Sequence, residues 1–337
     1  MSIEYVNFGT GGVNVSRMAL GLGFRGQFDR GEAEKVINTA LDSGINLIDC
    51  ANTYGFMDDR RNIGSSEQVL GKALKGRRDD VVITSKVHSP VGDGPNDLGA
   101  SRYHIMREVE RSLSRLDTDH IDVYLFHAVD DVALFEEQFR TMETLIQHGK
   151  IRYVGVSNFQ AWQVMQALCV QKQINAQPLI AVQNPYSLMN RTQEDELFPM
   201  VRETGVGVMA YSPLGVGLLS GTYRPDEVPD DSTLWGMRRK GQVAKFMQGR
   251  AGRVIAAVDE VAADLGVSMP QVAMAWVMSH REITVTISGA DTVEQMIDVS
   301  GAMELELPTE AIAKLDAVSY GMRTVLDGEE SEIVDEY

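Results

Sequence analysis

Four side chains with complementary chemistry lie at or just beyond the ends of apolar segments that are typical of buried strands. Asp49 and Lys86 each end such a segment, Tyr54 follows the first one after a short turn, and His127 ends a third. A carboxylate at the end of a buried strand is costly unless a partner neutralises it, and the lysine is a candidate cation. If the strands are parallel, their carboxyl ends meet on one face, where all four side chains could converge.

The order of the expected elements favours such an arrangement. After an expected hairpin at residues 3–15, strand and helix signals alternate through the chain. Strands are predicted at 18–21, 46–49, 81–86, 122–127, 153–157, 180–183, 207–211 and 284–288. Helices are predicted at 31–43, 66–74, 102–115, 134–147, 161–172, 194–203, 251–265, 270–280, 292–302 and 308–319.

This alternation predicts an α/β fold, a (β/α)8 TIM barrel with active-site loops at the carboxyl ends of its strands. The N-terminal β-hairpin and extra helices, before the seventh barrel helix and at the C-terminus, are additions to the barrel. No linker or change in composition divides the chain. We therefore expect a single domain over residues 1–337, with an acidic tail at about residues 321–337.

Composition narrows the class of protein. The chain has 337 residues, of which 44% are hydrophobic and 23% charged, as in ordinary globular proteins. The net charge of −17 argues against a nucleic-acid partner, which would require a basic surface. Two cysteines imply no disulfide framework, and no metal site is expected. No signal peptide and no membrane-spanning run are visible, so we expect a cytoplasmic protein with no membrane partner.

A glycine pattern near the N-terminus offers a competing interpretation. Residues 21–26 read G-x-G-x-x-G after an expected strand, and Asp49 follows at the spacing of a ribose-binding acid. That combination is the signature of a doubly wound dinucleotide-binding domain. However, residues 27–31 separate the pattern from the expected helix, whose N-terminus should face the pyrophosphate. We therefore interpret the pattern as a loop at the mouth of a barrel.

Several longer motifs occur in order along the chain. Residues 49–55 match D-x-A-x-x-Y-G, and three further stretches read GKIRYVGVSNF (149–159), VQNPYS (182–187) and YSPLGVGLLSG (211–221). Together they resemble the aldo-keto reductase family over nearly the whole chain. The resemblance implies an eight-stranded barrel that binds a nicotinamide cofactor. It also implies that Asp49, Tyr54, Lys86 and His127 are the catalytic tetrad.

The implied chemistry suits these residue types. The cofactor transfers the hydride and the protein must move the proton, so the oxygen of a reduced carbonyl needs a donor. Tyr54 can be that acid, although an unperturbed tyrosine has a pKa of about 10. Lys86 would lower the pKa of Tyr54, Asp49 would hold Lys86 charged, and His127 would polarise the carbonyl. In the oxidative direction Tyr54 would act as the base.

The resemblance also implies a cofactor site. Ser157, Asn158 and Gln183 would hold the nicotinamide amide group, and Tyr211 would stack on its ring. Backbone N–H groups of a glycine-rich loop can approach phosphates closely. The backbone at Ser212, Leu214, Gly217 and Leu219 would therefore follow the pyrophosphate.

The segment at 288–295, SGADTVEQ, resembles the adenosine-binding stretch, with Gly289, Asp291 and Gln295 as expected contacts. Many NADPH-using relatives carry arginine or lysine where Asp291 stands. A carboxylate repels a 2′-phosphate but accepts a hydrogen bond from a free 2′-hydroxyl. Of NAD(H) and NADP(H), the sequence thus slightly favours NAD(H). In the alternative, Asp291 faces solvent and the NADPH phosphate is held by Arg238, Arg239, Lys240 or Gln295.

The substrate side is expected to carry Phe24, Arg25, Phe56 and His88, which suit a small carbonyl compound or sugar. Trp235 is interpreted as an ordinary loop residue. The sequence therefore predicts an NAD(P)(H)-dependent oxidoreductase that interconverts a carbonyl and an alcohol, with Tyr54 as general acid and base. The alternative is a cofactor-binding regulatory subunit with little turnover, because relatives attached to potassium channels share the barrel. The sequence indicates neither the natural substrate nor the oligomeric state.

Overall fold

The structure, a computed structural model, describes residues 3–223, 229–231, 233, 235–236, 247 and 249–323. The strands of the central sheet are β3 (Met18–Gly21), β4 (Leu47–Asp49), β5 (Val82–Val87), β6 (Ile121–Phe126), β7 (Ile151–Ser157), β8 (Ala181–Pro185), β9 (Gly207–Tyr211) and β10 (Ile283–Ser288). They pair in parallel and close in the order β10-β3-β4-β5-β6-β7-β8-β9. The predicted (β/α)8 barrel is therefore confirmed.

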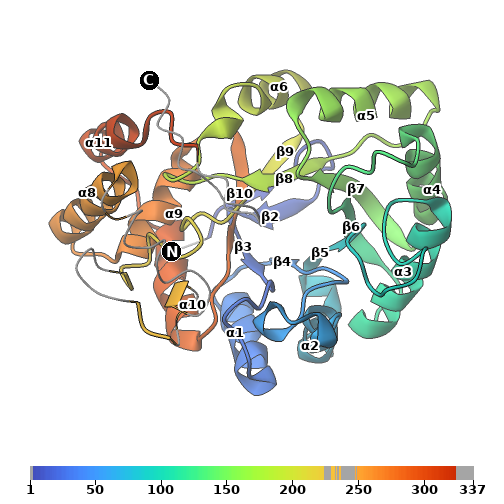
Figure 1. Ribbon diagram of the computed structural model, residues 1–337, viewed down its shortest axis with the longest axis horizontal. Coiled ribbons are helices and arrows are strands. Elements are labelled where there is room, and N and C mark those ends of the chain that lie inside the picture. The colour runs from blue at the N-terminus through green and yellow to red at the C-terminus, as the bar shows by residue number, and fades with distance from the viewer. Residues whose placement is uncertain are drawn as a thin grey trace.

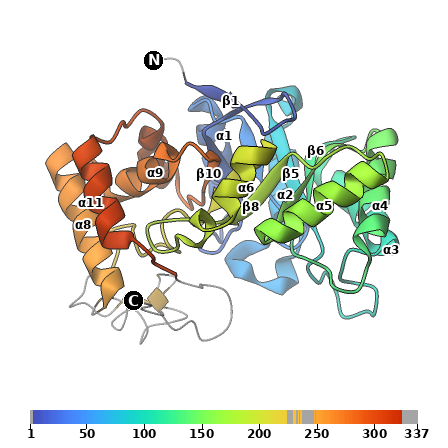
Figure 2. The ribbon, with the colours of Figure 1, turned by 90° about the horizontal axis from the view of Figure 1, so that it is seen from above.

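Helices surround the barrel in Figure 1. Two of them, at residues 250–265 and 309–319, lie side by side outside the ring in both ribbon views (Figures 1 and 2). The helix expected at 194–203 begins three residues later, because residues 192–194 form a separate short turn. The helices are α1 (Arg30–Asp42), α2 (Ser65–Ala73), α3 (Arg102–Leu116), α4 (Phe135–Gln147), α5 (Ala161–Gln173), α6 (Leu197–Thr204), α8 (Arg250–Leu265), α9 (Met269–Ser279), α10 (Val293–Ser300) and α11 (Thr309–Ser319).

Local sequence accounts for several of these boundaries. Asp29, Ser101 and Ser268 are N-cap residues of α1, α3 and α9, and each side chain accepts a hydrogen bond from a backbone N–H of the first turn. Strands β5 and β6 are buried nearly throughout, as expected for a parallel sheet covered by helices. The capped helices and buried strands thus specify the alternation from which the barrel was predicted.

The amino end of the barrel is closed by a hairpin of β1 (Tyr5–Asn7) and β2 (Asn14–Ser16), at the top of Figure 2. Phe8 and Val15 are fully buried and belong to the apolar cluster that fills the barrel interior. The turn lies so close to the barrel that a Cβ on Gly9 would come within 2.1 Å of the Ile180 carbonyl oxygen. The carboxyl end of the barrel therefore remains for a site.

The lengths and compositions of the helices were compared with those of membrane-spanning segments. No single helix in the described residues is long and apolar enough to cross a membrane. Helices α8 and α9 meet that criterion together, but they are bent by 100° relative to each other.

Candidate active site

Uncommon backbone conformations gather at the carboxyl end of the barrel. Non-glycine residues seldom adopt positive φ, and such strain is often found at functional sites. Among the described non-glycine residues with positive φ, Asp117 and Asn175 follow helices. The others follow barrel strands: Phe24, Met57, Asp58, His88, Asn158, Ser212 and Val216. This distribution marks the same face as the four side chains with complementary chemistry.

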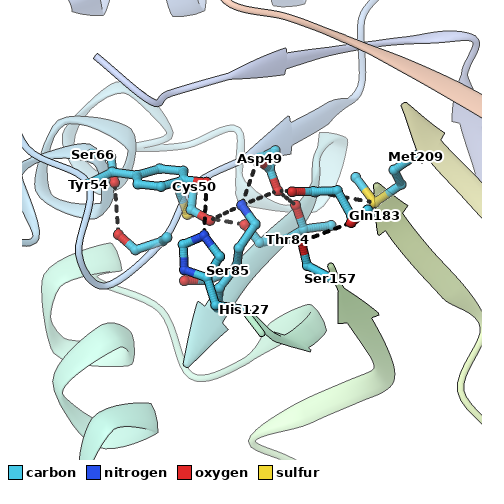
Figure 3. Close-up of polar contacts among 12 residues, drawn as sticks. Asp49, Cys50, Tyr54, Ser66, Thr84, Ser85, His127, Ser157, Gln183 and Met209 are labelled. Atoms are coloured by element: carbon cyan, nitrogen blue, oxygen red, sulfur yellow. Dashed lines mark hydrogen bonds and ion pairs between the residues drawn. The ribbon is translucent and has the colours of Figure 1, made fainter. Parts of the chain in front are cut away.

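Asp49 and Lys86 form an ion pair at this face, where β4 and β5 end. The Lys86 Nζ atom donates to the two carboxylate oxygens of Asp49 at 2.8 Å and 2.7 Å, and the side chains are 0% and 5% exposed. Thr84 Oγ1 and Gln183 Nε2 also donate to Asp49, at 2.6 Å and 2.9 Å (Figure 3). The carboxylate thus has the partners that its burial requires.

Lys86 is a permanent cation behind the site. Its ammonium also donates to the Cys50 carbonyl at 3.0 Å, so three hydrogen bonds hold it. Burial, the largest single influence, would lower the pKa of Lys86, but the charges and hydrogen bonds of Asp49 and Tyr54 together outweigh it and the pKa is raised. The cation is therefore retained in spite of its burial. The Cys50 thiol is fully buried and burial raises its pKa well above the ordinary range, which agrees with an inert thiol.

The Tyr54 ring lies against this cation, with Lys86 Nζ 4.6 Å from the ring centroid. Burial raises the pKa of Tyr54 while the charge of Lys86 lowers it, and the net pKa lies above the ordinary value. As predicted, the charge of Lys86 lowers the pKa of Tyr54. The net pKa is nevertheless raised, because burial has the larger effect. Tyr54 keeps its proton at neutral pH, as a proton donor must.

His127 is placed beside the Tyr54 hydroxyl. Its Nε2 is 3.4 Å from Tyr54 Oη, and the two rings meet edge to face. Burial lowers the pKa of His127 to about 3, and nearby basic side chains act in the same direction. The imidazole is therefore neutral at physiological pH, so one ring nitrogen is a hydrogen-bond donor and the other an acceptor.

The turn that carries Tyr54 is held by residues that the sequence analysis did not identify. Ser66 donates from its backbone N–H to the Tyr54 carbonyl at 3.2 Å and from its hydroxyl to the Ala51 carbonyl at 3.0 Å. Asn52 donates to the fully buried Glu108 at 3.3 Å. Serine in the first turn of a helix is common, so the sequence carried no signal of this role.

The residues expected to hold the nicotinamide group lie together at the ends of β7, β8 and β9. Ser157 donates to the Gln183 carbonyl at 2.9 Å, and Asn158 Nδ2 donates to the His127 carbonyl at 2.8 Å. Tyr211 donates to Asn158 Oδ1 at 2.8 Å. These hydroxyl and amide groups fit a carboxamide, which both donates and accepts hydrogen bonds. Their role in cofactor binding stays a prediction.

The loop after β9 has left-handed backbone at Ser212 and Val216, with φ of 54° and 55°. The N–H groups of Gly217 and Leu219 both donate to the Leu214 carbonyl, at 3.1 Å and 3.0 Å. Two amides that were expected to follow the pyrophosphate are thus engaged within the loop itself. The loop has the turned, glycine-rich backbone of anion-binding loops, and phosphate contacts at Ser212 and Leu214 stay a prediction.

Asp291 lies beneath the loop after β3. Its carboxylate accepts from the Gly26 backbone N–H, and a Cβ on Gly26 would come within 2.3 Å of Oδ2. Gln27 Nε2 donates to the Asp291 carbonyl at 2.5 Å, and the Asp291 N–H donates to Gln295 Oε1 at 2.8 Å. Burial raises the pKa of Asp291 to about 6. The alternative in which this carboxylate points freely into solvent does not describe the structure.

Asp291 has no cationic neighbour that offsets its charge among the residues that the structure describes. Among the described residues, no cation contributes to its pKa, and no ion pair involves it. Gly289 is exposed and a Cβ there would meet no atom within 4 Å. The basic residues considered for a phosphate site, Arg238, Arg239 and Lys240, lie outside the described residues.

Two of the residues expected to contact substrate pack on each other. The rings of Phe24 and Phe56 stack with centroids 4.8 Å apart and an interplanar angle of 4°. Each is 7% exposed, so together they join the loops after β3 and β4. A role as a substrate wall stays a prediction.

The other loop residues differ in exposure. Arg25 is exposed, and His88 is half-buried with a pKa lowered by burial. Trp235, interpreted from the sequence as an ordinary loop residue, is 2% exposed, and its Nε1 donates to the Val216 carbonyl at 2.8 Å, so it is a buried packing residue. Substrate contacts by Arg25 and His88 stay predictions.

The glycine pattern at residues 21–26 does not form a dinucleotide-binding turn. Helix α1 begins at Arg30, where the Asp29 side chain caps it by accepting from the Glu32 N–H at 2.8 Å. Asp49 bonds Lys86 instead of facing a ribose, and the sheet is closed instead of doubly wound. The competing interpretation is therefore wrong.

Comparison with known proteins agrees with this geometry. The sequence model described as "Aldo/keto reductase family" matches residues 8–320. "Uncharacterized oxidoreductase YrpG" of Bacillus subtilis (strain 168) is 36% identical over 330 residues, which cover 95% of this chain and 97% of the relative. Proteins named "Probable voltage-gated potassium channel subunit beta" are similar as well. The one from Oryza sativa subsp. japonica is 32% identical (94% of this chain, 96% of the relative), and the one from Arabidopsis thaliana is 31% identical (90% and 92%).

Proposed function

The chain belongs to the aldo/keto reductase family, and from that premise we propose that it is an oxidoreductase that interconverts a carbonyl compound and an alcohol. The observation that carries this proposal is the Tyr54 hydroxyl beside the ring of His127, with the Lys86–Asp49 pair buried behind it. The family generally binds NAD(P)(H), and a bound nicotinamide supplies or accepts the hydride.

In the proposed reduction, the residues of the chain handle the substrate oxygen and its proton. Tyr54 donates its proton to the carbonyl oxygen as negative charge develops there. His127 donates a second hydrogen bond to the same oxygen, which requires its N–H at Nε2, the nitrogen that faces Tyr54. Lys86 stabilises the phenolate that remains, and Asp49 keeps Lys86 in place. In oxidation the same steps run in reverse.

The proposed cofactor site uses groups that lie next to this centre. Ser157, Asn158 and Gln183 would hold the carboxamide, and Tyr211 would stack on the ring. Their hydrogen bonds to one another and to the His127 backbone support this, because they link the donor set to the residue beside the proposed proton donor Tyr54.

A panel of aldehydes, aldoses, ketones and secondary alcohols, assayed with both cofactors through the absorbance of the reduced nicotinamide, tests the proposed function. Turnover of at least one carbonyl class is the expected result. Tight cofactor binding with no turnover across the panel would argue for the regulatory alternative.

The pH dependence of reduction should follow Tyr54 and not His127. With a pKa lowered to about 3 by burial, His127 does not titrate near neutrality. An acid must carry its proton, so activity is present below the pKa of Tyr54 and is lost as the pH rises above it. Because burial raises that pKa, kcat/KM should stay level from about pH 5 to about pH 8 and decline only above about pH 10. A limb with a midpoint near the ordinary pKa of histidine, about 6.5, that is present at saturating cofactor and persists in Asp291→Asn would contradict a neutral His127.

We also propose a preference for NAD(H), based on the carboxylate of Asp291, which has no cationic neighbour among the described residues. Asp291→Asn should tighten NADP(H) binding about tenfold and change NAD(H) binding by less than about twofold, because the variant removes repulsion of the 2′-phosphate. Asparagine can still accept from the Gly26 N–H, so the loop contact is retained. Fluorescence titration of both cofactors is the measurement, with the exposed Glu304→Gln as a charge-matched control. If the unmodified protein binds NADP(H) more tightly than NAD(H), the proposed preference for NAD(H) is wrong.

The second candidate is a cofactor-binding regulatory subunit. It is favoured by the names of the two plant relatives, which are about as similar to this chain as the bacterial oxidoreductase. Such a role requires binding without fast turnover, whereas the proton donor and its supports are all present in this chain. The substrate panel separates the two candidates directly.

A further inference from the structure

Ser89 makes a polar contact in the site that the proposed mechanism leaves without a role. Its Oγ is 3.2 Å from Nδ1 of His127, while Nε2 of the same ring faces Tyr54. A neutral imidazole carries a single N–H, at Nδ1 or at Nε2, and the group next to one nitrogen decides which tautomer is stable. Ser89 is therefore in a position to determine which nitrogen of His127 is the donor.

The backbone on both sides fixes Ser89 in this place. His88 has a φ of 136°, which L-residues rarely adopt, and its carbonyl accepts from the Gly99 N–H at 2.7 Å. Pro90 follows, which restricts Ser89 to extended conformations. The Pro90 carbonyl accepts from Arg60 at 3.2 Å. Backbone strain of this kind persists where the surrounding structure enforces it, and it is frequent at functional sites.

The backbone of His127 is equally well fixed. Its N–H donates to the Val87 carbonyl at 2.8 Å, and its own carbonyl accepts from Asn158 at 2.8 Å. With the backbone of His127 fixed, the ring proton can still lie on either nitrogen. Its position depends on the contacts of the two ring nitrogens.

The two possible arrangements of the Ser89 contact are not equivalent. In the part of the chain that the structure describes, His127 Nδ1 is the one hydrogen-bond partner of the Ser89 hydroxyl. If the hydroxyl donates to Nδ1, its proton has an acceptor and the ring proton lies at Nε2. If Nδ1–H donates instead, Nε2 accepts the Tyr54 proton, so neither side chain has a proton directed at a substrate oxygen, and the Ser89 hydroxyl proton has no acceptor among the described residues.

We propose that Ser89 is a positioning residue that donates to Nδ1 of His127 and thereby holds the ring proton at Nε2, on the side of Tyr54. The consequence for turnover rests on the proposed carbonyl chemistry, in which Nε2–H binds the substrate oxygen. The tautomer itself does not depend on that chemistry, so the two can be tested separately.

Ser89→Ala should lower kcat for carbonyl reduction about tenfold, the effect of one lost hydrogen bond on a donor that must point at the substrate. The cofactor Kd should stay within about twofold, because Ser89 acts through His127 alone. Ser89→Thr keeps a hydroxyl and should restore most of the rate. Ser114→Ala, at an exposed position on α3, is the matched control and should behave as the unmodified protein. Equal kcat for Ser89→Ala and the unmodified protein would overturn the role in turnover.

The tautomer is read independently by ¹⁵N NMR of histidine-labelled protein, with His127→Asn used to identify the His127 signals. The Nε2–H tautomer is expected in the unmodified protein and in Ser89→Thr, and a mixture with Nδ1–H in Ser89→Ala. An Nδ1–H tautomer in the unmodified protein, or no change in Ser89→Ala, would refute the proposal even if the enzyme is active. If nothing in the substrate panel is turned over, the proposed function fails, and the NMR result still decides whether Ser89 sets the tautomer.

Discussion

Replacing Tyr54 with phenylalanine should abolish most carbonyl reduction while leaving the fold and the cofactor site intact. The variant removes the proposed proton donor, and loss of general acid catalysis typically lowers kcat by about 10²–10⁴-fold. The contact of the hydroxyl to His127 is long, at 3.4 Å, so its removal breaks only a weak hydrogen bond to that residue. The phenylalanine ring can still pack on Lys86. We therefore expect a change in unfolding free energy of less than about 1 kcal/mol.

The experiment needs three measurements on one preparation of Tyr54→Phe. These are kcat with the best carbonyl of the substrate panel, the cofactor Kd by fluorescence titration, and the midpoint of denaturant unfolding. Tyr103→Phe is the matched control, because Tyr103 is 63% exposed on α3 and lies away from the proposed chemistry. A rate within a few-fold of the unmodified protein would remove Tyr54 from the role of acid. A low rate together with a weakened cofactor Kd would instead indicate a disturbed site.

The arrangement of the barrel could be predicted because it depends on local patterns. Apolar runs that alternate with amphipathic helices specify parallel strands, and residues that end such strands must share one face. Lys86 and Thr84 are two residues apart on β5 and bond the same carboxylate, as strand periodicity requires. The expected partners Asp49 and Lys86 were therefore accessible from their positions alone.

Some properties of the site depend on the combined effects of burial, neighbouring charges and loop contacts. These properties could not be predicted from the sequence. The pKa of Tyr54 reflects a competition between burial, which raises it, and the charge of Lys86, which lowers it. A motif reveals the cation but not the depth of burial, so the net direction was mistaken. The position of Asp291 beneath Gly26 and the contact of Ser89 with His127 arise from loops that meet only in the folded barrel. The conformations of such loops are not reflected in the hydrophobic periodicity of the sequence.

Breaking the Lys86–Asp49 pair should have the largest effect on stability. Lys86→Met leaves a carboxylate that is 5% exposed without its cation, and removal of one partner from a buried pair typically costs about 3–5 kcal/mol. The hydrogen bonds from Thr84 and Gln183 to Asp49 remain, which favours the lower end of this range. The comparison is Lys72→Met, which removes an ion pair to Glu34 in which the lysine is 68% exposed. That control should cost less than about 1 kcal/mol in denaturant unfolding.

The double variant Asp49→Leu/Lys86→Met distinguishes a structural pair from a functional one. Replacing both charges leaves no buried ion, so the double variant should be less destabilised than Lys86→Met alone. Catalysis should not recover with stability, because the phenolate of Tyr54 would lack the cation that lies 4.6 Å from its ring. A double variant destabilised by the full sum of the Asp49→Leu and Lys86→Met effects would mean that the two side chains contribute independently, which would contradict their coupling as a pair. A stable but inactive double variant would mean that the barrel tolerates the loss of this pair and that the pair is retained for the chemistry of Tyr54.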